Sequence, residues 1–123
     1  MSRILVVDDD EAVLEMLRAT LEWEGYDVDG AADGNAAILA QRAHPADLVI
    51  TDIIMPDKEG LETIVDLRRD WPDTKIIAIS GGGRLATGDY LGVAQRLGAS
   101  RVFPKPIERE KLLGAIRELL GEA

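Results

Sequence analysis

The chain has 123 residues, of which 46% are hydrophobic and 30% are charged, and its formal net charge is −9. This length suits a single domain with its own core, and the acidic excess argues against nucleic-acid binding, which needs clustered Lys and Arg. The lack of cysteine excludes disulfides and thiolate metal sites. No apolar run approaches the roughly 20 residues that span a bilayer, and residues 1–7 do not resemble a signal peptide, so we expect a cytoplasmic protein without a membrane partner.

Apolar, β-branched runs alternate with helical patterns along the chain. The first run, residues 3–7, has the length of a strand, and apolar residues at helical spacing follow it over residues 11–24. The same alternation predicts further strands at 26–31, 47–51, 75–80 and 100–103 and further helices at 34–43, 60–71, 89–97 and 108–120. Asp10 and Asp33 are the predicted N-caps of the first two helices, and Gly25 ends the first. Trp23 and Trp71, near helix ends, are expected to cover the edge of the core.

Five strand–helix pairs in strict alternation predict an α/β fold. Strands that are apolar along their whole length are typical of a parallel sheet covered by helices on both faces. Right-handed crossovers make an open, doubly wound (βα)₅ sheet the expected topology. Neither a repeat nor a linker interrupts the pattern, so residues 1–123 are expected to form one domain.

Chemically active side chains follow four of the predicted strands, at the edge where ligands bind in such sheets. The first strand leads into Asp8 and Asp9, the third into Asp52, and the fifth into Lys105, while the fourth ends in Ser80. Parallel strands bring their carboxyl ends to one edge, so these groups are expected to share a cleft.

Three ionised carboxylates in one cleft repel each other, and a hard divalent cation removes that repulsion. Mg²⁺ prefers oxygen ligands, takes few carboxylates and keeps open positions, which suits a phosphoryl oxygen. One carboxylate can then act as a nucleophile toward phosphorus, with Lys105 and Ser80 contacting other phosphoryl oxygens. Taken singly, the run of acids after the first strand can be plain helix capping and Asp52 a loop-starting turn. The conjunction at four strand ends favours a site.

The motifs that carry these residues resemble the receiver domain of two-component response regulators, of which the chemotaxis type is one member. They are ILVVDDDE at 4–11, DLVITDIIMPDKEGLE at 47–62, IIAIS at 76–80, LGA at 97–99 and PKP at 104–106. The resemblance runs from end to end and implies the flavodoxin-like strand order 2-1-3-4-5.

The resemblance also implies a phosphoacceptor and a metal site. Asp52 is expected to accept the phosphoryl group and, with Asp9, to bind Mg²⁺ directly, while Asp8 binds it through water. The backbone carbonyl of Ile54 is a further expected ligand, presented by the turn of Met55-Pro56 and Gly60.

The remaining implied roles concern the switch. Lys105 is expected to contact the phosphoryl group and Ser80 to turn toward it, and a cis peptide bond is common before the residue matching Pro106. The phosphoryl donor is expected to be a sensor histidine kinase or a phosphotransfer protein. The output is expected to be a protein partner that binds the face of the fourth helix, fifth strand and fifth helix. Such a receiver accepts a phosphoryl group and is not a turnover enzyme.

The chain departs from the common receiver pattern near the switch. Many receivers carry Tyr or Phe three residues before the lysine, where this chain has Val102, and the neighbouring Phe103 is expected to face the other side of the sheet. The segment between Ser80 and Lys105 is also longer than usual. Its surplus falls in the glycine-rich residues GGGRLATGDYLG at 81–92. We expect a mobile loop there, in which residues 81–88 reorder on phosphorylation in place of ring rotation.

Three alternatives remain open. The chain can be a receiver cut from a larger response regulator or hybrid kinase. It can be a phosphatase of the haloacid-dehalogenase class, although DDDEAV at 8–13 lacks the threonine expected after that nucleophile. It can also be a nucleotide- or flavin-binding module, although no glycine-rich phosphate loop follows the first strand.

Overall fold

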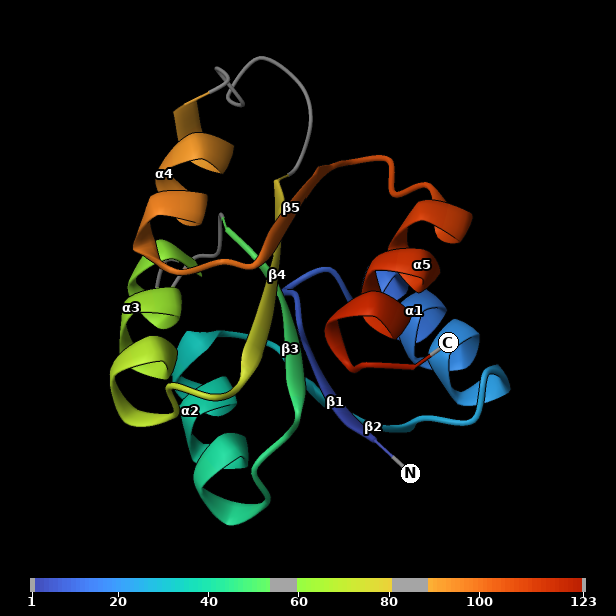
Figure 1. The fold of residues 1–123 in the computed structure, drawn as a ribbon. Coiled ribbons are helices and arrows are strands. Elements are labelled where there is room, and N and C mark those ends of the chain that lie inside the picture. Colours follow the sequence, from blue (N-terminus) through green and yellow to red (C-terminus); the bar gives the residue numbers. More distant parts are fainter. Residues whose placement is uncertain (1, 54–59, 81–88, 123) are drawn as a thin grey trace.

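A computed structural model describes residues 2–53, 60–80 and 89–122 of the chain. Strands and helices alternate within these ranges (Figure 1). The elements are β1 (Arg3–Val7), α1 (Glu11–Trp23), β2 (Asp27–Ala31), α2 (Gly34–Ala43), β3 (Leu48–Asp52), α3 (Gly60–Asp70), β4 (Lys75–Ser80), α4 (Asp89–Leu97), β5 (Arg101–Pro104) and α5 (Arg109–Leu119). The predicted boundaries agree with these to within one residue, which is the usual uncertainty at element ends.

The five strands form one parallel sheet in the order β2-β1-β3-β4-β5. This confirms the predicted doubly wound α/β fold and the strand order that the resemblance implied. Val7 of β1 pairs with Thr51 of β3, and Ser80 of β4 pairs with Pro104 of β5. The carboxyl ends of these four strands therefore lie next to one another along one edge of the sheet.

Helices cover both faces of the sheet, α2, α3 and α4 on one and α1 and α5 on the other (Figure 1). Alternate residues of each strand enter two separate cores, as the period of two requires. The first core joins Leu5, Val49 and Ile76 to the α2–α3–α4 side, and the second joins Ile4, Ile50 and Ile77 to the α1–α5 side. Burying each such side chain contributes about 1.5–3 kcal/mol.

Local signals place the helix ends where they were predicted. The Asp10 side chain accepts hydrogen bonds from the N–H groups of Ala12 and Val13, and the Asp33 side chain accepts one from Ala36. Gly25 follows α1 with a φ of 97°, which glycine adopts without strain.

The two tryptophans behave differently. Trp71 packs against the first core, as expected. The prediction for Trp23 was wrong, since 83% of its surface is exposed at the end of α1. The prediction rested on the position of Trp23 near a helix end, and that position alone does not determine whether a neighbouring element covers the ring.

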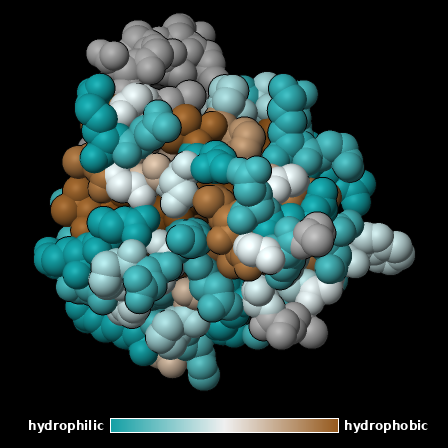
Figure 2. Space-filling model, in the orientation of Figure 1, coloured by the Kyte–Doolittle hydropathy of each residue, from teal (hydrophilic) through white to brown (hydrophobic). Residues whose placement is uncertain are grey.

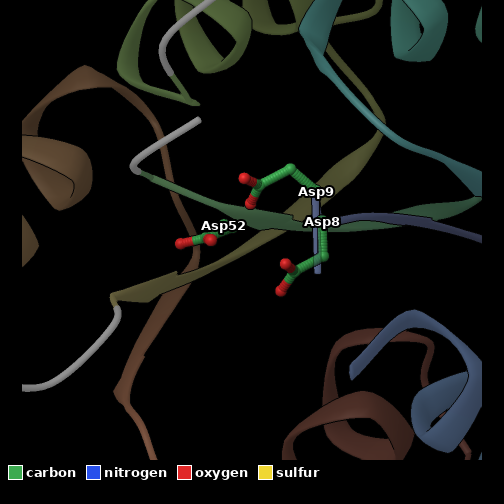
Figure 3. A group of neighbouring side chains, drawn as sticks. All are labelled: Asp8, Asp9 and Asp52. Atoms are coloured by element: carbon green, nitrogen blue, oxygen red, sulfur yellow. The ribbon is translucent and has the colours of Figure 1, made fainter. Parts of the chain in front are cut away.

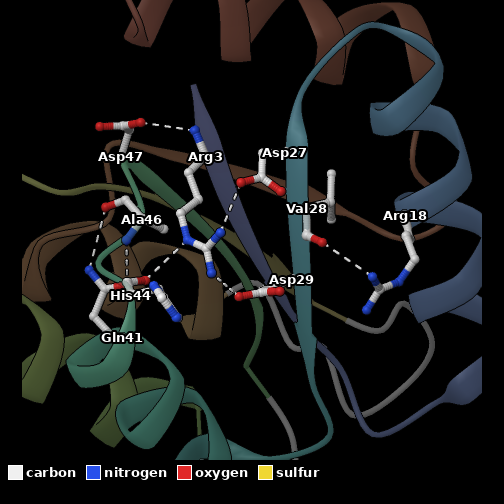
Figure 4. A network of polar contacts seen from close by, with 9 residues as sticks. All are labelled: Arg3, Arg18, Asp27, Val28, Asp29, Gln41, His44, Ala46 and Asp47. Atoms are coloured by element: carbon white, nitrogen blue, oxygen red, sulfur yellow. Dashed lines mark hydrogen bonds and ion pairs between the residues drawn. The ribbon is translucent and has the colours of Figure 1, made fainter. Parts of the chain in front are cut away.

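A polar cluster lies at the amino edge of the sheet, around Gln41 (Figure 4). The buried Gln41 side chain accepts a hydrogen bond from the Ala46 N–H at 2.9 Å and donates to the Ala46 carbonyl and the Thr74 hydroxyl. Nearby, the Arg3 guanidinium bonds the carboxylates of Asp27 and Asp29. The Arg3 Nε also donates to the His44 carbonyl at 3.2 Å, which ties the loop between α2 and β3 to the first strand.

Hydrophilic residues cover much of the face that carries α4, β5 and α5, and a few hydrophobic residues show between these elements (Figure 2). Within the described ranges, no helix is long and apolar enough to cross a membrane.

Candidate phosphoacceptor and metal site

Three carboxylates meet beyond the ends of β1 and β3 (Figure 3). Asp8 and Asp9 directly follow β1, and Asp52 is the last residue of β3. One oxygen from each side chain lies within 4.8 Å of the others. Asp8 and Asp52 are only 2% and 5% exposed, whereas Asp9 is exposed. The strand register therefore produces the cluster that the sequence predicted.

Lys105 reaches into this cluster from the end of β5. Its Nζ lies 3.1 Å from Oδ2 of Asp8 and 3.4 Å from Oδ2 of Asp52. The Lys105 N–H donates to the Ser80 carbonyl at 2.9 Å, which holds the backbone of Lys105 beside β4. The peptide bond between Lys105 and Pro106 is cis, as the resemblance implied.

The charge of Lys105 is stabilised by its neighbours. Burial alone would lower the pKa of this amine, but the carboxylates of Asp52 and Asp8 outweigh that effect and raise the pKa above its ordinary value. Lys105 therefore remains an ammonium ion and offsets part of the negative charge.

Ser80 completes the site from the end of β4. The residue is 1% exposed, and its Oγ has no hydrogen-bond partner within the described part of the chain. A buried hydroxyl without a partner is unfavourable. Its position at the same sheet edge as Lys105 and Asp52 suits a group that donates to an incoming acceptor.

The donor set fits a hard divalent cation. Among the described residues, three carboxylates cluster here and one ammonium group, that of Lys105, contacts two of them, which leaves an excess of negative charge. All the side-chain ligands are oxygens, as Mg²⁺ prefers. The Asp10 N–H donates to Oδ1 of Asp8 at 2.8 Å, which fixes that carboxylate in place.

Gly60, the first residue of α3, lies directly against the backbone of Asp52. Its N–H donates to the Ile53 carbonyl at 2.7 Å. A Cβ on Gly60 would lie 2.0 Å from the carbonyl oxygen of Asp52, a contact that no side chain can make. The sequence predicts Gly60 in the turn after Asp52. The steric need for glycine at this position could not be predicted, because it depends on how closely α3 approaches β3.

Two parts of the prediction lie outside the described residues. These are the metal-binding carbonyl of Ile54, with the turn at Met55-Pro56, and the proposed mobile loop at 81–88. On β5, Phe103 packs on the α1–α5 side and Val102 on the α2–α3–α4 side, which confirms their predicted opposite orientations.

Known proteins share this architecture. Among curated proteins, the response regulator MprA of Mycolicibacterium vanbaalenii is 37% identical, matching 96% of this chain and 50% of its own length. The transcriptional regulatory protein CpxR of Klebsiella pneumoniae subsp. pneumoniae is 36% identical, over 98% of this chain and 50% of its own length. The chain thus spans about half the length of these relatives.

Solved structures also share this fold. A CheY-like response regulator receiver domain protein from Methanospirillum hungatei superimposes with a TM-score of 0.87 at 34% identity, covering 98% of this chain and 94% of that one. The receiver domain of NtrX from Brucella abortus gives a TM-score of 0.88 at 26% identity, covering 98% and 99%.

The family model that matches describes the response regulator receiver domain and covers residues 4–117. Proteins of this family are signalling phosphoacceptors rather than turnover enzymes, typically bind Mg²⁺ at an acidic pocket, and interact with histidine kinases or phosphotransfer proteins. Because the family model matches nearly its whole length, this chain belongs to the response regulator receiver domain family.

Proposed function

We propose that Asp52 accepts a phosphoryl group from a sensor histidine kinase or a phosphotransfer protein, with Mg²⁺ as the cofactor. The observation that carries this proposal is the convergence of Asp8, Asp9, Asp52 and Lys105 beside a buried Ser80 hydroxyl that has no partner among the described residues. An acidic cluster alone has many explanations. An acidic cluster with a charged lysine and an unpaired hydroxyl is suited to a tetrahedral anion held next to a cation.

The three carboxylates differ in the role that their surroundings favour. Oδ1 of Asp8 accepts from the Asp10 N–H and Oδ2 contacts Lys105, so Asp8 is suited to a fixed ligand role. Asp9 is exposed and can bind a cation that keeps several waters. Asp52 is buried at the strand end, and its backbone is held by α3 through Gly60, which makes it the best-placed nucleophile.

Asp8, Asp9 and Asp52 would hold Mg²⁺, together with the Ile54 carbonyl in the undescribed segment; the bound ion would offset the carboxylate charge and polarise the phosphoryl group. A carboxylate oxygen of Asp52 forms the bond to phosphorus, and the bond from phosphorus to the donor's nitrogen breaks, leaving its electron pair on that nitrogen. Lys105 follows the phosphoryl oxygens because the acceptor's charge increases. The Ser80 hydroxyl donates to another phosphoryl oxygen.

The output follows from the same contacts. Movement of Ser80 and Lys105 toward the phosphoryl group favours one arrangement of the α4–β5–α5 face, and a downstream protein that prefers this arrangement is recruited. Residues 1–123 act as one receiver domain. This domain acts either alone or as part of a larger regulator, as the curated relatives of about twice its length suggest. We place this exchange in the cytoplasm.

The decisive experiment is incubation with a small phosphodonor, with and without Mg²⁺, followed by mass spectrometry of the intact protein and its peptides. The wild type should gain one phosphoryl group in the presence of Mg²⁺, and Asp52→Asn should gain none. Asp73→Asn is the matched control, because Asp73 is an exposed carboxylate remote from the site, and it should behave as the wild type. An adduct mapped to Asp8 or Asp9, or steady hydrolysis of a phosphomonoester, would contradict the proposal.

A further inference from the structure

Arg68, near the end of α3, connects that helix to the carboxyl end of α4. Its Nη1 donates to the Pro72 carbonyl at 2.6 Å and its Nη2 donates to the Gly98 carbonyl at 2.7 Å. Pro72 follows α3 and Gly98 follows α4, so one guanidinium satisfies carbonyl groups just beyond two helices. A cation is favoured at helix carboxyl ends, and the planar fork of arginine suits two acceptors.

Gly98 is shaped for this contact. Its φ is 130°, a conformation that side chains rarely adopt, and a Cβ there would lie 2.9 Å from Nε of Arg68. The Arg68 side chain therefore occupies the space that a larger residue would need. The Ala99 N–H closes the helix end by donating to the Ala94 carbonyl at 3.0 Å, and the Ser100 N–H joins the sheet at Ile76.

The other end of α3 lies against the proposed phosphoacceptor. Gly60 packs on the Asp52 carbonyl and donates to the Ile53 carbonyl at 2.7 Å. The buried Ile64 and Leu67 fix the helix to the sheet between its two ends. The first residue of α3 therefore contacts the end of β3, the strand that carries Asp52. Arg68, near the last residue of α3, contacts the carboxyl end of α4.

The fifth strand offers no aromatic link to α4. Its one aromatic side chain, Phe103, packs on the α1–α5 side, and Val102 occupies the side that α4 covers. The contact through Arg68 is thus a connection between Asp52 and α4 that does not depend on a ring in β5.

We propose that Arg68 is a positioning residue of the switch. It holds the carboxyl end of α4 to α3, so that α4 responds to phosphorylation by turning about residues 97–99 and does not shift as a whole. The response to phosphorylation rests on the proposed function, whereas the fixed helix end is a property of the unmodified protein.

The first arm of the test uses the unmodified protein and measures amide exchange at Gly98 and Ala99. Arg68→Gln should speed exchange there by about tenfold, because charge-assisted bonds at the helix end are lost. Arg68→Lys, which keeps the charge without the fork, should give an intermediate increase. Arg69→Gln is the matched control, since Arg69 pairs on the surface with Asp66 and Asp70. This variant should leave the exchange rates of the Gly98 and Ala99 amides unchanged. Equal exchange in all four proteins would overturn the proposal.

The second arm repeats the measurement after reaction with the phosphodonor and Mg²⁺. In the wild type, the amide exchange rates should change at the α4 residues that precede Leu97 but not at residues 97–99. In Arg68→Gln, the change should extend through residues 97–99. A change that reaches 97–99 in both proteins would refute the turning motion. If mass spectrometry finds no adduct on Asp52, the proposed function and the turning motion both fail, while the first arm still decides whether Arg68 fixes the helix end.

Discussion

The two edges of the sheet carry buried polar clusters of opposite character. At the amino edge, the Gln41 amide donates to the Thr74 hydroxyl, and both side chains form hydrogen bonds with the backbone of Ala46. At the carboxyl edge, carboxylates crowd together and the Ser80 hydroxyl has no partner in the described ranges. Buried polar groups that satisfy one another stabilise a fold, whereas groups left in excess mark a place where something else binds. This difference favours a structural role for the cluster at the amino edge and supports the binding role proposed for the cluster at the carboxyl edge.

The largest effect should come from breaking the satisfied cluster. Gln41→Ala removes the acceptor of the Ala46 N–H and a donor to the Ala46 carbonyl, and should lower the free energy of unfolding by about 3 kcal/mol. Urea denaturation measures this value. Gln95→Ala, an exposed glutamine on α4, serves as the control and should change stability by less than about 0.5 kcal/mol. Equal losses in both variants would mean that the Gln41 network contributes little.

Mg²⁺ should bind the carboxylate cluster at the carboxyl edge and stabilise the fold. At a concentration ten times the dissociation constant, the ion should raise the free energy of unfolding by about 1.4 kcal/mol. Asp9→Asn should remove most of this gain, while the exposed Asp73→Asn should retain it. Thermal unfolding with and without Mg²⁺, at constant ionic strength, measures the difference. An identical gain in Asp9→Asn would place the ion elsewhere.

Removing the Ser80 hydroxyl, which has no partner within the described residues, should cost no stability. Ser80→Ala should leave the free energy of unfolding unchanged or raise it by up to about 1 kcal/mol, because a buried donor without a partner disappears. Thr51→Val is the comparison on the neighbouring strand, since the Thr51 hydroxyl donates to the Asp52 carbonyl at 3.0 Å, and should lose about 1 kcal/mol. A clear loss in Ser80→Ala would show that its hydroxyl is already satisfied.

The smallest effect concerns pH at the amino edge. The Tyr26 hydroxyl donates to Glu122 at 2.8 Å, and burial together with this carboxylate raises the pKa of Tyr26 from 10.0 to about 12. The fold therefore favours the protonated phenol. Its contribution is complete below pH 10 and is lost as the pH rises to about 12. The stability difference between wild type and Tyr26→Phe should shrink over this range, and a constant difference would exclude the effect.

Much of the fold and the chemistry of the site could be predicted from the sequence. Strand and helix periods are local, and parallel strands must bring their carboxyl ends together, so Asp8, Asp52 and Lys105 could be assigned to one edge before any distance was known. The site also followed from the resemblance, which supplied specific roles that residue chemistry left open.

Contacts between elements could not be predicted in this way. The final positions of separate helices and strands decide four features: the bridge from Arg68 to Gly98, the lack of a Ser80 partner among the described residues, the steric need for Gly60 and the exposure of Trp23. Residues next to them in sequence carry no signal for these features, because each depends on whether a residue from a distant part of the chain lies close by.

The order of apolar and polar residues along the chain was thus enough to determine the alternating elements, the parallel sheet and the kind of chemistry at its edge. Tertiary structure alone decided which buried polar groups are satisfied and which, like the Ser80 hydroxyl, have no partner within the described residues. The physical reason is range: backbone periodicity acts over a few residues, whereas hydrogen bonding and charge compensation in the interior are set by groups that the fold brings together from distant positions.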